Sequence, residues 1–301
     1  MAPLARKMVN YWQIYVLMSA GIICYVLFRI LPLWGLSIAF FDFNIVGGIT
    51  KSPFVGLYYF QNLMSDPRFF RMFRNTVAIS MINLVFAFPA PILLAMIFNE
   101  LRHKHFQRLT QTIVYMPHFL SWPVIYGLTF SLFSVDMGVV NKFIASIGAE
   151  PIRFLSNINT FWYVLLFQNI WRELGWSSIV YLAAISQIDM ALYEAATVDG
   201  ATRLQKMFRI TLPCLLPTII VMFLMRLGRF LDVSFEQVLL MTNDYVTPVS
   251  EIFDTYSYRV GVQMGNYSIG TAVGLFKSVL SLFLVVVSNW AIKKSGNSGM
   301  F

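Results

Sequence analysis

Charged residues, cysteine and histidine are all scarce in this chain of 301 residues. Asp, Glu, Lys and Arg together make up only 12% of the sequence, whereas 58% of it is hydrophobic and the mean hydropathy is +0.67. A soluble domain needs far more polar surface than this. The composition therefore excludes a soluble globular protein and predicts a polytopic membrane protein.

Other absences narrow the function. The two cysteines, Cys24 and Cys214, lie in or beside apolar segments without neighbouring His or Cys clusters, so we predict neither a disulfide nor a metal site. The chain lacks the pattern G-x-x-x-x-G-K-[ST], and therefore has no P-loop for ATP. No internal repeat or low-complexity linker stands out, and we expect one domain over residues 1–301.

The positive charge of the chain has a membrane explanation. There are 22 Lys and Arg against 14 Asp and Glu, a net charge of +8 that might otherwise suggest nucleic acid. The basic residues cluster at the ends of apolar segments, so we expect them to orient the chain in a membrane and predict no nucleic-acid partner. The basic N-terminal segment lacks a small-residue cleavage site, and we expect a retained first helix rather than a signal peptide.

Six apolar windows are long enough to span a bilayer, which requires about 20 residues each. The windows are about 12–41, 76–99, 110–133, 160–185, 213–241 and 268–292. They predict an all-α membrane protein with six transmembrane helices. With six spans, four clusters of basic residues fall on one side of the membrane: before the first window, after the second, after the fourth and after the sixth. Positive charge favours the cytoplasmic side, so we expect both termini in the cytoplasm. Arg68, Arg71 and Arg74 oppose this orientation, since they lie on the outer side.

The stretch at about 188–213 leaves the membrane because it is rich in charge, and reads EAATVDGATRLQKMFRITLP from Glu194 to Pro213. Its apolar residues recur at three- and four-residue intervals, which predicts two short amphipathic helices. Gly200 lies between them, where a reversal needs a positive φ. We expect the next membrane helix to begin at Pro213. Such a hairpin either docks on a soluble partner or lies on the membrane surface.

A family resemblance decides between these alternatives. The segment resembles the EAA loop of permease subunits of bacterial binding-protein-dependent ABC importers: EAA, three residues, Gly, nine residues and I-x-L-P. The motif is filled here by Glu194, Ala195, Ala196, Gly200, Ile210, Leu212 and Pro213. The resemblance implies a loop that couples to an ATPase through Glu194, Ala195, Ala196, Asp199, Gly200, Leu204, Met207 and Phe208.

Weaker similarities point to the carbohydrate branch of that family. Phe54-Val55-Gly56-Leu57 after the first window and the run Tyr115 to Phe119 are similar to segments of maltose-permease-like and polysaccharide permeases. His118, within the second of these, either gates or touches substrate or has a structural role.

Two polar stripes lie within the predicted fourth and fifth helices. The stripe in the fourth comprises Gln168, Asn169, Arg172, Glu173 and Trp176, and the stripe in the fifth comprises Arg226, Arg229, Asp232, Glu236 and Gln237. Each covers roughly 140° of a helix, and we expect the two stripes to meet. Intramembrane charges face a protein interior or a water-filled path.

Two interpretations of the stripes stay open. Arg229 pairs with Asp232, and Arg172 with Glu173 or Glu236, as contacts between helices. Alternatively, the stripes line a substrate path in which a sugar replaces water on these groups. Because Arg binds carboxylates through two parallel hydrogen bonds, Arg226 and Arg229 favour an acidic oligosaccharide.

The resemblance implies a subunit without catalytic residues, metal or cofactor of its own. It implies a second, related permease, two ATPase subunits that hold ATP and Mg, an extracytoplasmic solute-binding protein, an oligosaccharide substrate and a bacterial cell membrane with its lipid.

Two alternative functions are a secondary sugar transporter and a membrane-embedded polysaccharide-modifying enzyme. The first typically has two related halves, which are not evident here. The second needs a carboxyl pair, for which Glu173 with Glu236 or Asp232 is the candidate.

Overall fold

The computed structural model describes residues 11–101 and 103–294, which form an all-helical chain. About 78% of the chain is helical, and the described residues contain no strand beyond one isolated bridge between Phe41 and Phe54. The prediction of an all-α chain with helices in its apolar segments is therefore confirmed. Both chain ends lie outside the described residues.

The chain divides into two compact units. The first comprises the described residues up to Asp66 together with Ser257–Phe276, and the second comprises Pro67–Tyr256 and the described residues from Lys277. The prediction of a single domain is not tested by this division.

The first unit begins with a long helix, Trp12–Phe40, whose α2 part is Trp12–Tyr25. No residue of α2 is buried. The rest of the unit consists of α3 (Tyr58–Ser65), short 3-10 and π turns, and the start of α16 (Tyr267–Lys294).

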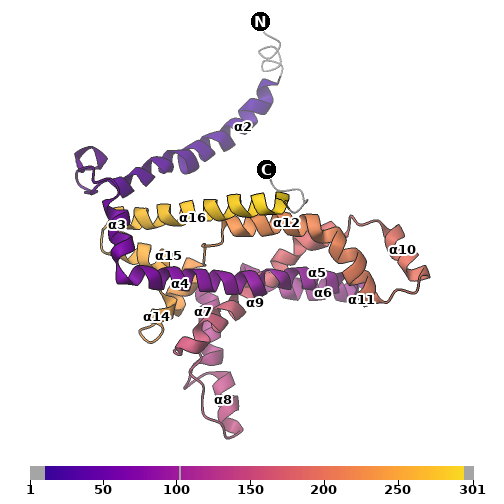
Figure 1. Cartoon of the computed structure of the whole chain (residues 1–301). Coiled ribbons are helices and arrows are strands. Elements are labelled where there is room, and N and C mark those ends of the chain that lie inside the picture. Colours follow the sequence, from indigo (N-terminus) through magenta and orange to yellow (C-terminus); the bar gives the residue numbers. More distant parts are fainter. Residues whose placement is uncertain (1–10, 102, 295–301) are drawn as a thin grey trace. The chain divides into compact units, whose positions relative to one another are not determined.

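A small core in this unit contains Ala39, Tyr59 and Ala272. The Tyr59 hydroxyl donates to Asp42 at 2.6 Å, and burial together with this bond raises the pKa of Tyr59 to about 12. The phenol therefore stays protonated at neutral pH and keeps its role as a donor. The loop after the first long helix is thus tied to α3 (Figure 1).

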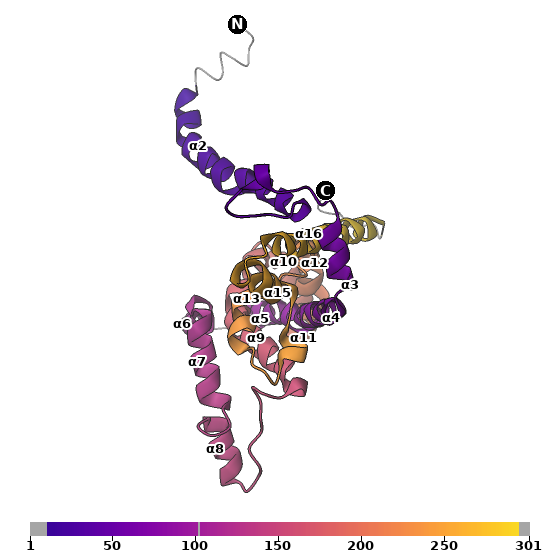
Figure 2. The same cartoon turned by 90° about the vertical axis from the view of Figure 1, so that its left-hand side faces the viewer.

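The second unit holds most of the helices. These are α4 (Pro67–Ile82), α5 (Pro89–Asn99), α6 (Lys104–Tyr115), α7 (Trp122–Phe133), α8 (Val139–Ser146), α9 (Ile158–Ile185), α10 (Met190–Val198), α11 (Arg203–Lys206), α12 (Leu212–Gly228), α13 (Phe235–Met241), α14 (Thr247–Ser250), α15 (Phe253–Ser257) and the later part of α16. The view in Figure 2 separates α7 and α8 from the other helices of this unit.

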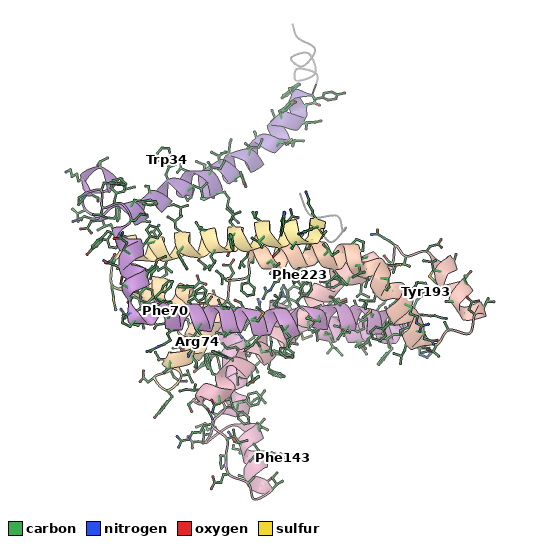
Figure 3. All side chains as sticks on the ribbon, in the orientation of Figure 1. Trp34, Phe70, Arg74, Phe143, Tyr193 and Phe223 are labelled. Carbon is green, nitrogen blue, oxygen red and sulfur yellow. The ribbon has the colours of Figure 1, made fainter. Side chains whose placement is uncertain are left out.

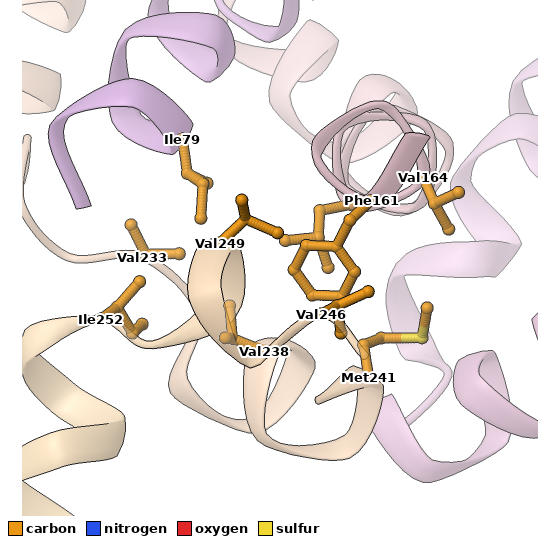
Figure 4. Close-up of a cluster of buried hydrophobic side chains, with 10 residues drawn as sticks. Ile79, Phe161, Val164, Val233, Val238, Met241, Val246, Val249 and Ile252 are labelled. Carbon is orange, nitrogen blue, oxygen red and sulfur yellow. The ribbon is translucent and has the colours of Figure 1, made fainter. Parts of the chain in front are cut away.

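The 28-residue helix α9 organises the second unit, because α5, α6 and α12 all pack against it. Near its N-terminus, Phe161, Val164 and Leu165 join α13, α14 and the end of α4 in one hydrophobic cluster (Figure 4). Near its C-terminus, Tyr181 and Ile185 pack in a second cluster with α5 and α12. The polar middle of α9 lies between these two cores.

Four described helices are long and apolar enough to cross a membrane, and a fifth is added if α9 and α10, which meet at a bend of 78°, form one span. The first and sixth windows match Trp12–Phe40 and Tyr267–Lys294 closely. The second span starts earlier than predicted, at Pro67, and therefore takes in the arginines that precede the window.

The third and fifth windows differ from the prediction of continuous helices. A 3-10 turn, Met116–Phe119, separates α6 from α7, because Pro117 and Pro123 each remove a backbone donor there. The helix that contains α12 already starts at Arg203 rather than at Pro213, which lies within its continuous turns. It ends at Gly228, and residues 229–234 form a non-helical break before α13.

Close packing of α6 against α9 depends on Gly175. A Cβ added at this position would lie 2.3 Å from the carbonyl oxygen of Val114. We expect Gly175→Ala to destabilise the protein by about 1–3 kcal/mol through overpacking, and to lower the midpoint of thermal unfolding of the purified protein. The matched control is Gly127→Ala in α7, where an added Cβ meets nothing within 4 Å. Equal midpoints for the two variants would contradict this account.

Candidate functional site

A cavity of about 450 Å³ lies in the second unit, where the two predicted stripes meet. It is lined by Ser80, Asn83, Ala87, Phe88, Pro91, Trp122, Asn169, Arg172, Glu173, Ser177, Tyr181, Met222, Met225, Arg226, Arg229, Asp232, Val233, Ser234 and Gln237. The lining comes from α4 and the π-helical turn after it, from α5, α7, α9 and α12, and from α13 and the break after Gly228, so segments far apart in the sequence build it. Apolar and charged side chains share its wall, as expected of a site that contacts both faces and polar groups of a ligand.

On α9, the charged part of the stripe forms an internal network. Arg172 pairs with its neighbour Glu173, which confirms one of the two partners predicted for it. The Arg172 guanidinium also stacks over Trp122 at 4.9 Å and lies 3.4 Å from the carbonyl oxygen of Leu120. Because Glu173 neutralises it and Trp122 covers it, Arg172 contributes little net positive charge to the cavity.

His118 joins the same network from the 3-10 turn that interrupts the third window. Its Nδ1 lies 3.2 Å from a carboxylate oxygen of Glu173, and its ring stacks in parallel on Trp176 with centroids 4.6 Å apart. Trp176 itself does not line the cavity. These contacts favour the structural role for His118. Trp176 is 45% exposed, and its place on the substrate path stays a prediction.

The amide groups of the α9 stripe have different surroundings. Gln168 is buried, donates to the Thr129 hydroxyl at 2.8 Å and accepts a bond from Gln237 at 2.9 Å. It therefore holds α7, α9 and α13 together and does not line the cavity. Asn169 does line it, and donates at 2.7 Å to Asn83, which begins the π-helical turn after α4.

Arg226, Arg229 and Asp232 all reach the cavity, although not as one face of a helix. The helix ends at Gly228, and the amides of Arg229 and Asp232 instead donate to the carbonyl oxygens of Arg226 and Arg229 at 3.1 and 3.0 Å. Such three-residue turns stack successive side chains on one side. Glu236, beyond the break, is exposed and does not line the cavity, so the helical-face argument was wrong for this residue.

The predicted pair of Arg229 with Asp232 is also wrong. Asp232 pairs with Lys277 of α16 at 2.6 Å, and Lys277 bonds both carboxylate oxygens of Asp254 at 2.8 and 2.9 Å. Among the residues that the structure describes, Arg226 and Arg229 have no carboxylate at ion-pair distance. The cavity thus presents two guanidinium groups without a direct ion pair, and the charges of Glu173 and Asp232 act on Arg226 from beyond that distance.

Sequence reasoning missed several residues of this site. Asn83, Ser80 and Ser234 line the cavity, and Lys277 pairs with Asp232 from outside the stripes. A lysine within the sixth apolar window was the available signal for Lys277, because an intramembrane charge needs a partner.

At the other end of α9, the loop that resembles the EAA motif has well-defined geometry. The helix α10 ends at Val198, Gly200 has a φ of 77°, and α11 starts at Arg203, so the positive φ predicted for Gly200 is confirmed. Thr202 and Gln205 form a capping box at the start of α11.

Two side-chain bonds tie α10 to the helix that follows. Lys206 donates to the Thr197 hydroxyl at 2.6 Å, and the hydroxyls of Tyr193 and Thr211 lie 2.8 Å apart. Figure 3 marks Tyr193 on this loop. These bonds cross the turn at Gly200 and join the two sides of the loop.

The predicted coupling residues divide into two groups. Leu204 and Phe208 are 66% and 52% exposed, and Glu194, Ala195, Asp199 and Gly200 are exposed as well. Ala196 is half-buried, and Met207 packs into the cluster around Tyr181 and Leu215. Met207 therefore contributes to the packing of the loop on the helices, and its role in coupling stays a prediction. Val198, which the motif does not include, is more exposed than any of these apolar residues.

The described residues contain no group of three or more His, Cys, Asp or Glu side chains that could hold a metal ion. The cavity's polar groups are guanidinium, amide and hydroxyl groups together with two carboxylates that have cationic partners. This arrangement suits the binding of an anionic, hydroxyl-rich molecule.

Comparison with known proteins extends the resemblance to the whole chain. Residues 87–295 match the family described as "Binding-protein-dependent transport system inner membrane component". Protein LplB of Bacillus subtilis (strain 168) is 45% identical over 96% of this chain and 91% of its own. The polygalacturonan/rhamnogalacturonan transport system permease protein YteP of the same organism is 43% identical over 98% of this chain and 92% of its own.

Solved structures agree. A bacterial ABC transporter involved in the import of the acidic polysaccharide alginate contains a chain that superposes with a TM-score of 0.89 at 39% identity, covering 97% of this chain and 98% of that one. The alginate transporter in complex with an alginate pentasaccharide-bound periplasmic protein gives a TM-score of 0.89 at 38% identity, covering 98% and 99%. With several apolar spans, this chain is a multi-pass membrane protein. It belongs to the family of binding-protein-dependent transport system inner membrane components.

Proposed function

We propose that this chain is the permease subunit of an ATP-driven importer for acidic oligosaccharides. The observation that carries the proposal is the pair Arg226 and Arg229, which line the cavity without a direct ion pair. Arg226 is half-buried and Arg229 is exposed, so both guanidinium groups are open to a ligand, and a carboxylate of a uronate sugar can bind a guanidinium through two parallel hydrogen bonds. The names of the polygalacturonan permease and the alginate importer support the same substrate class.

The test is uptake by the complete importer, reconstituted in vesicles with its binding protein. Tetragalacturonate is compared with its carboxyl-reduced, neutral counterpart of the same length. We expect the acidic tetramer to be transported in strong preference. Equal uptake of the two tetramers would contradict the preference for acidic substrates but would still agree with a permease function.

We further propose that α10 and α11 couple this subunit to an ATPase, with the exposed Leu204 and Phe208 filling a cleft and Glu194 meeting a basic residue of that partner. The bend of 78° between α9 and α10 supports this role, because a push on the loop is transmitted to the helix that carries Arg172. The ATPase supplies ATP and Mg, and this chain supplies neither catalytic group nor cofactor.

The assembly we propose contains a second, related permease, two ATPase subunits and an extracytoplasmic solute-binding protein in the cell membrane. The broken third and fifth segments are each counted as one span, giving six spans with both termini in the cytoplasm. Non-helical backbone within a membrane is tolerated where it lines a cavity, which is where residues 229–234 lie.

An enzymatic role has less support. Glu173 is neutralised by Arg172, Asp232 by Lys277, and Glu236 does not reach the cavity. The cavity therefore offers no pair of free carboxylates among the residues that the structure describes, and glycoside hydrolysis requires such a pair.

A further inference from the structure

Lys277 is the centre of an ion cluster beside the cavity. Its ammonium lies 2.6 Å from Asp232 and bonds both oxygens of Asp254 at 2.8 and 2.9 Å. The Lys277 side chain is only 15% exposed, whereas Asp232 is 52% exposed. Asp232 belongs both to the cavity and to the ion cluster, because it lines the cavity and pairs with Lys277.

Asp232 lies one three-residue turn after Arg229, which itself lies one such turn after Arg226. Neighbouring side chains on successive turns of this kind are well placed to pair. Asp232 nonetheless pairs with Lys277, which reaches it from α16. The cavity has two carboxylates near the arginines: Glu173 pairs with Arg172, and Lys277 holds Asp232, so neither forms an ion pair with Arg226 or Arg229.

The charge balance shows what this contact changes. Arg226, Arg229 and Lys277 carry three positive charges, and Asp232 and Asp254 carry two negative ones. Without the lysine, two cations face two anions and the site is neutral by itself. With it, one positive charge remains for a ligand.

We propose that Lys277 is a positioning residue that determines the preference for acidic substrates, by preventing Asp232 from occupying the anion site formed by Arg226 and Arg229. This inference rests on the proposed function. Asp254 accepts two further hydrogen bonds from the same ammonium, which restricts the directions in which Lys277 can point. The substrate carboxylate then competes with water for the arginines, and not with a carboxylate of the protein itself.

The test is equilibrium binding of tetragalacturonate and of its neutral counterpart to the assembled transporter in detergent, without the soluble binding protein, so that only the membrane site contributes. For Lys277→Met, we expect the affinity for tetragalacturonate to fall about tenfold, or about 1.4 kcal/mol, and the affinity for the neutral tetramer to stay the same. Lys277→Met combined with Asp232→Asn is expected to restore acidic binding, because the competing carboxylate is gone. Lys277→Arg is expected to retain the wild-type affinity for tetragalacturonate.

Lys293→Met is the matched control, since this exposed lysine lies at the far end of α16. Asp232→Asn alone leaves Lys277 paired with Asp254 and is expected to bind the acidic tetramer at least as well as the wild type. A parallel loss of both tetramers, or no rescue in the double variant, would overturn the positioning role. If the wild type itself does not prefer the acidic tetramer, the proposed substrate class fails instead.

Discussion

Replacing Gly200 with valine is expected to abolish coupled transport while ATP hydrolysis by the assembled importer continues. Gly200 has a φ of 77°, a conformation that costs an L-residue about 1–2 kcal/mol and a β-branched one more. A change of that size shifts the balance between the native and a distorted loop by roughly 5–30-fold. The measurement is sugar uptake per ATP hydrolysed in vesicles.

The control for this prediction is Gly200→Asn. An added Cβ at this position meets nothing within 4 Å, so the cost of substitution is conformational and not steric. Asparagine adopts positive φ more readily than other side chains and is expected to retain most of the transport. If valine and asparagine behave alike, the turn at Gly200 is not what transmits the signal. Unchanged membrane insertion of both variants is checked by protease protection.

Loss of the cavity's two unpaired guanidinium groups is expected to have a comparably large effect on the substrate side. In the double variant Arg226→Gln and Arg229→Gln, the half-saturating concentration for tetragalacturonate is expected to rise about 100-fold or more. Each hydrogen bond to a charged group contributes about 1.5–3 kcal/mol, and tenfold in affinity corresponds to about 1.4 kcal/mol. The measurement is uptake of acidic and neutral tetramers at several concentrations.

Two further variants sharpen this test. Changing both arginines to lysine keeps the charge but removes the paired donors, and an intermediate loss is expected. Arg153→Gln removes an exposed arginine that does not line the cavity and is expected to have no effect. An equal loss for the neutral tetramer in the glutamine variant would show that the arginines maintain the fold and do not select the substrate.

Much of the architecture could be predicted from sequence because it follows from local rules. Apolar length located the first and sixth spans, and the need for a positive φ located the turn at Gly200. Spacing also placed Arg172, Arg226 and Arg229 at one cavity. These features depend on neighbours in the chain, and periodicity records such neighbours well.

The parts that could not be predicted depend on contacts between distant segments. The polar stripe predicted for the fifth window assumed a continuous helix. The helix instead ends at Gly228, and Glu236, beyond the break, does not line the cavity. The partner of Asp232 is Lys277, 45 residues later, and no helical spacing reports that distance. Likewise, Met207 follows the same three- to four-residue spacing as Leu204 and Phe208. Those two side chains are exposed, whereas Met207 packs against a hydrophobic cluster of the protein itself.

The helix α2 has a bearing on how the protein assembles. A membrane helix is stable in lipid before it meets any other helix, and a second, separate step of association gives the final packing. No residue of α2 is buried, so the first unit provides the helix with the first step alone. Whatever packs against α2 comes from outside the core that Ala39, Tyr59 and Ala272 form in that unit. Melting of that small core would therefore leave α2 out of its cooperative transition.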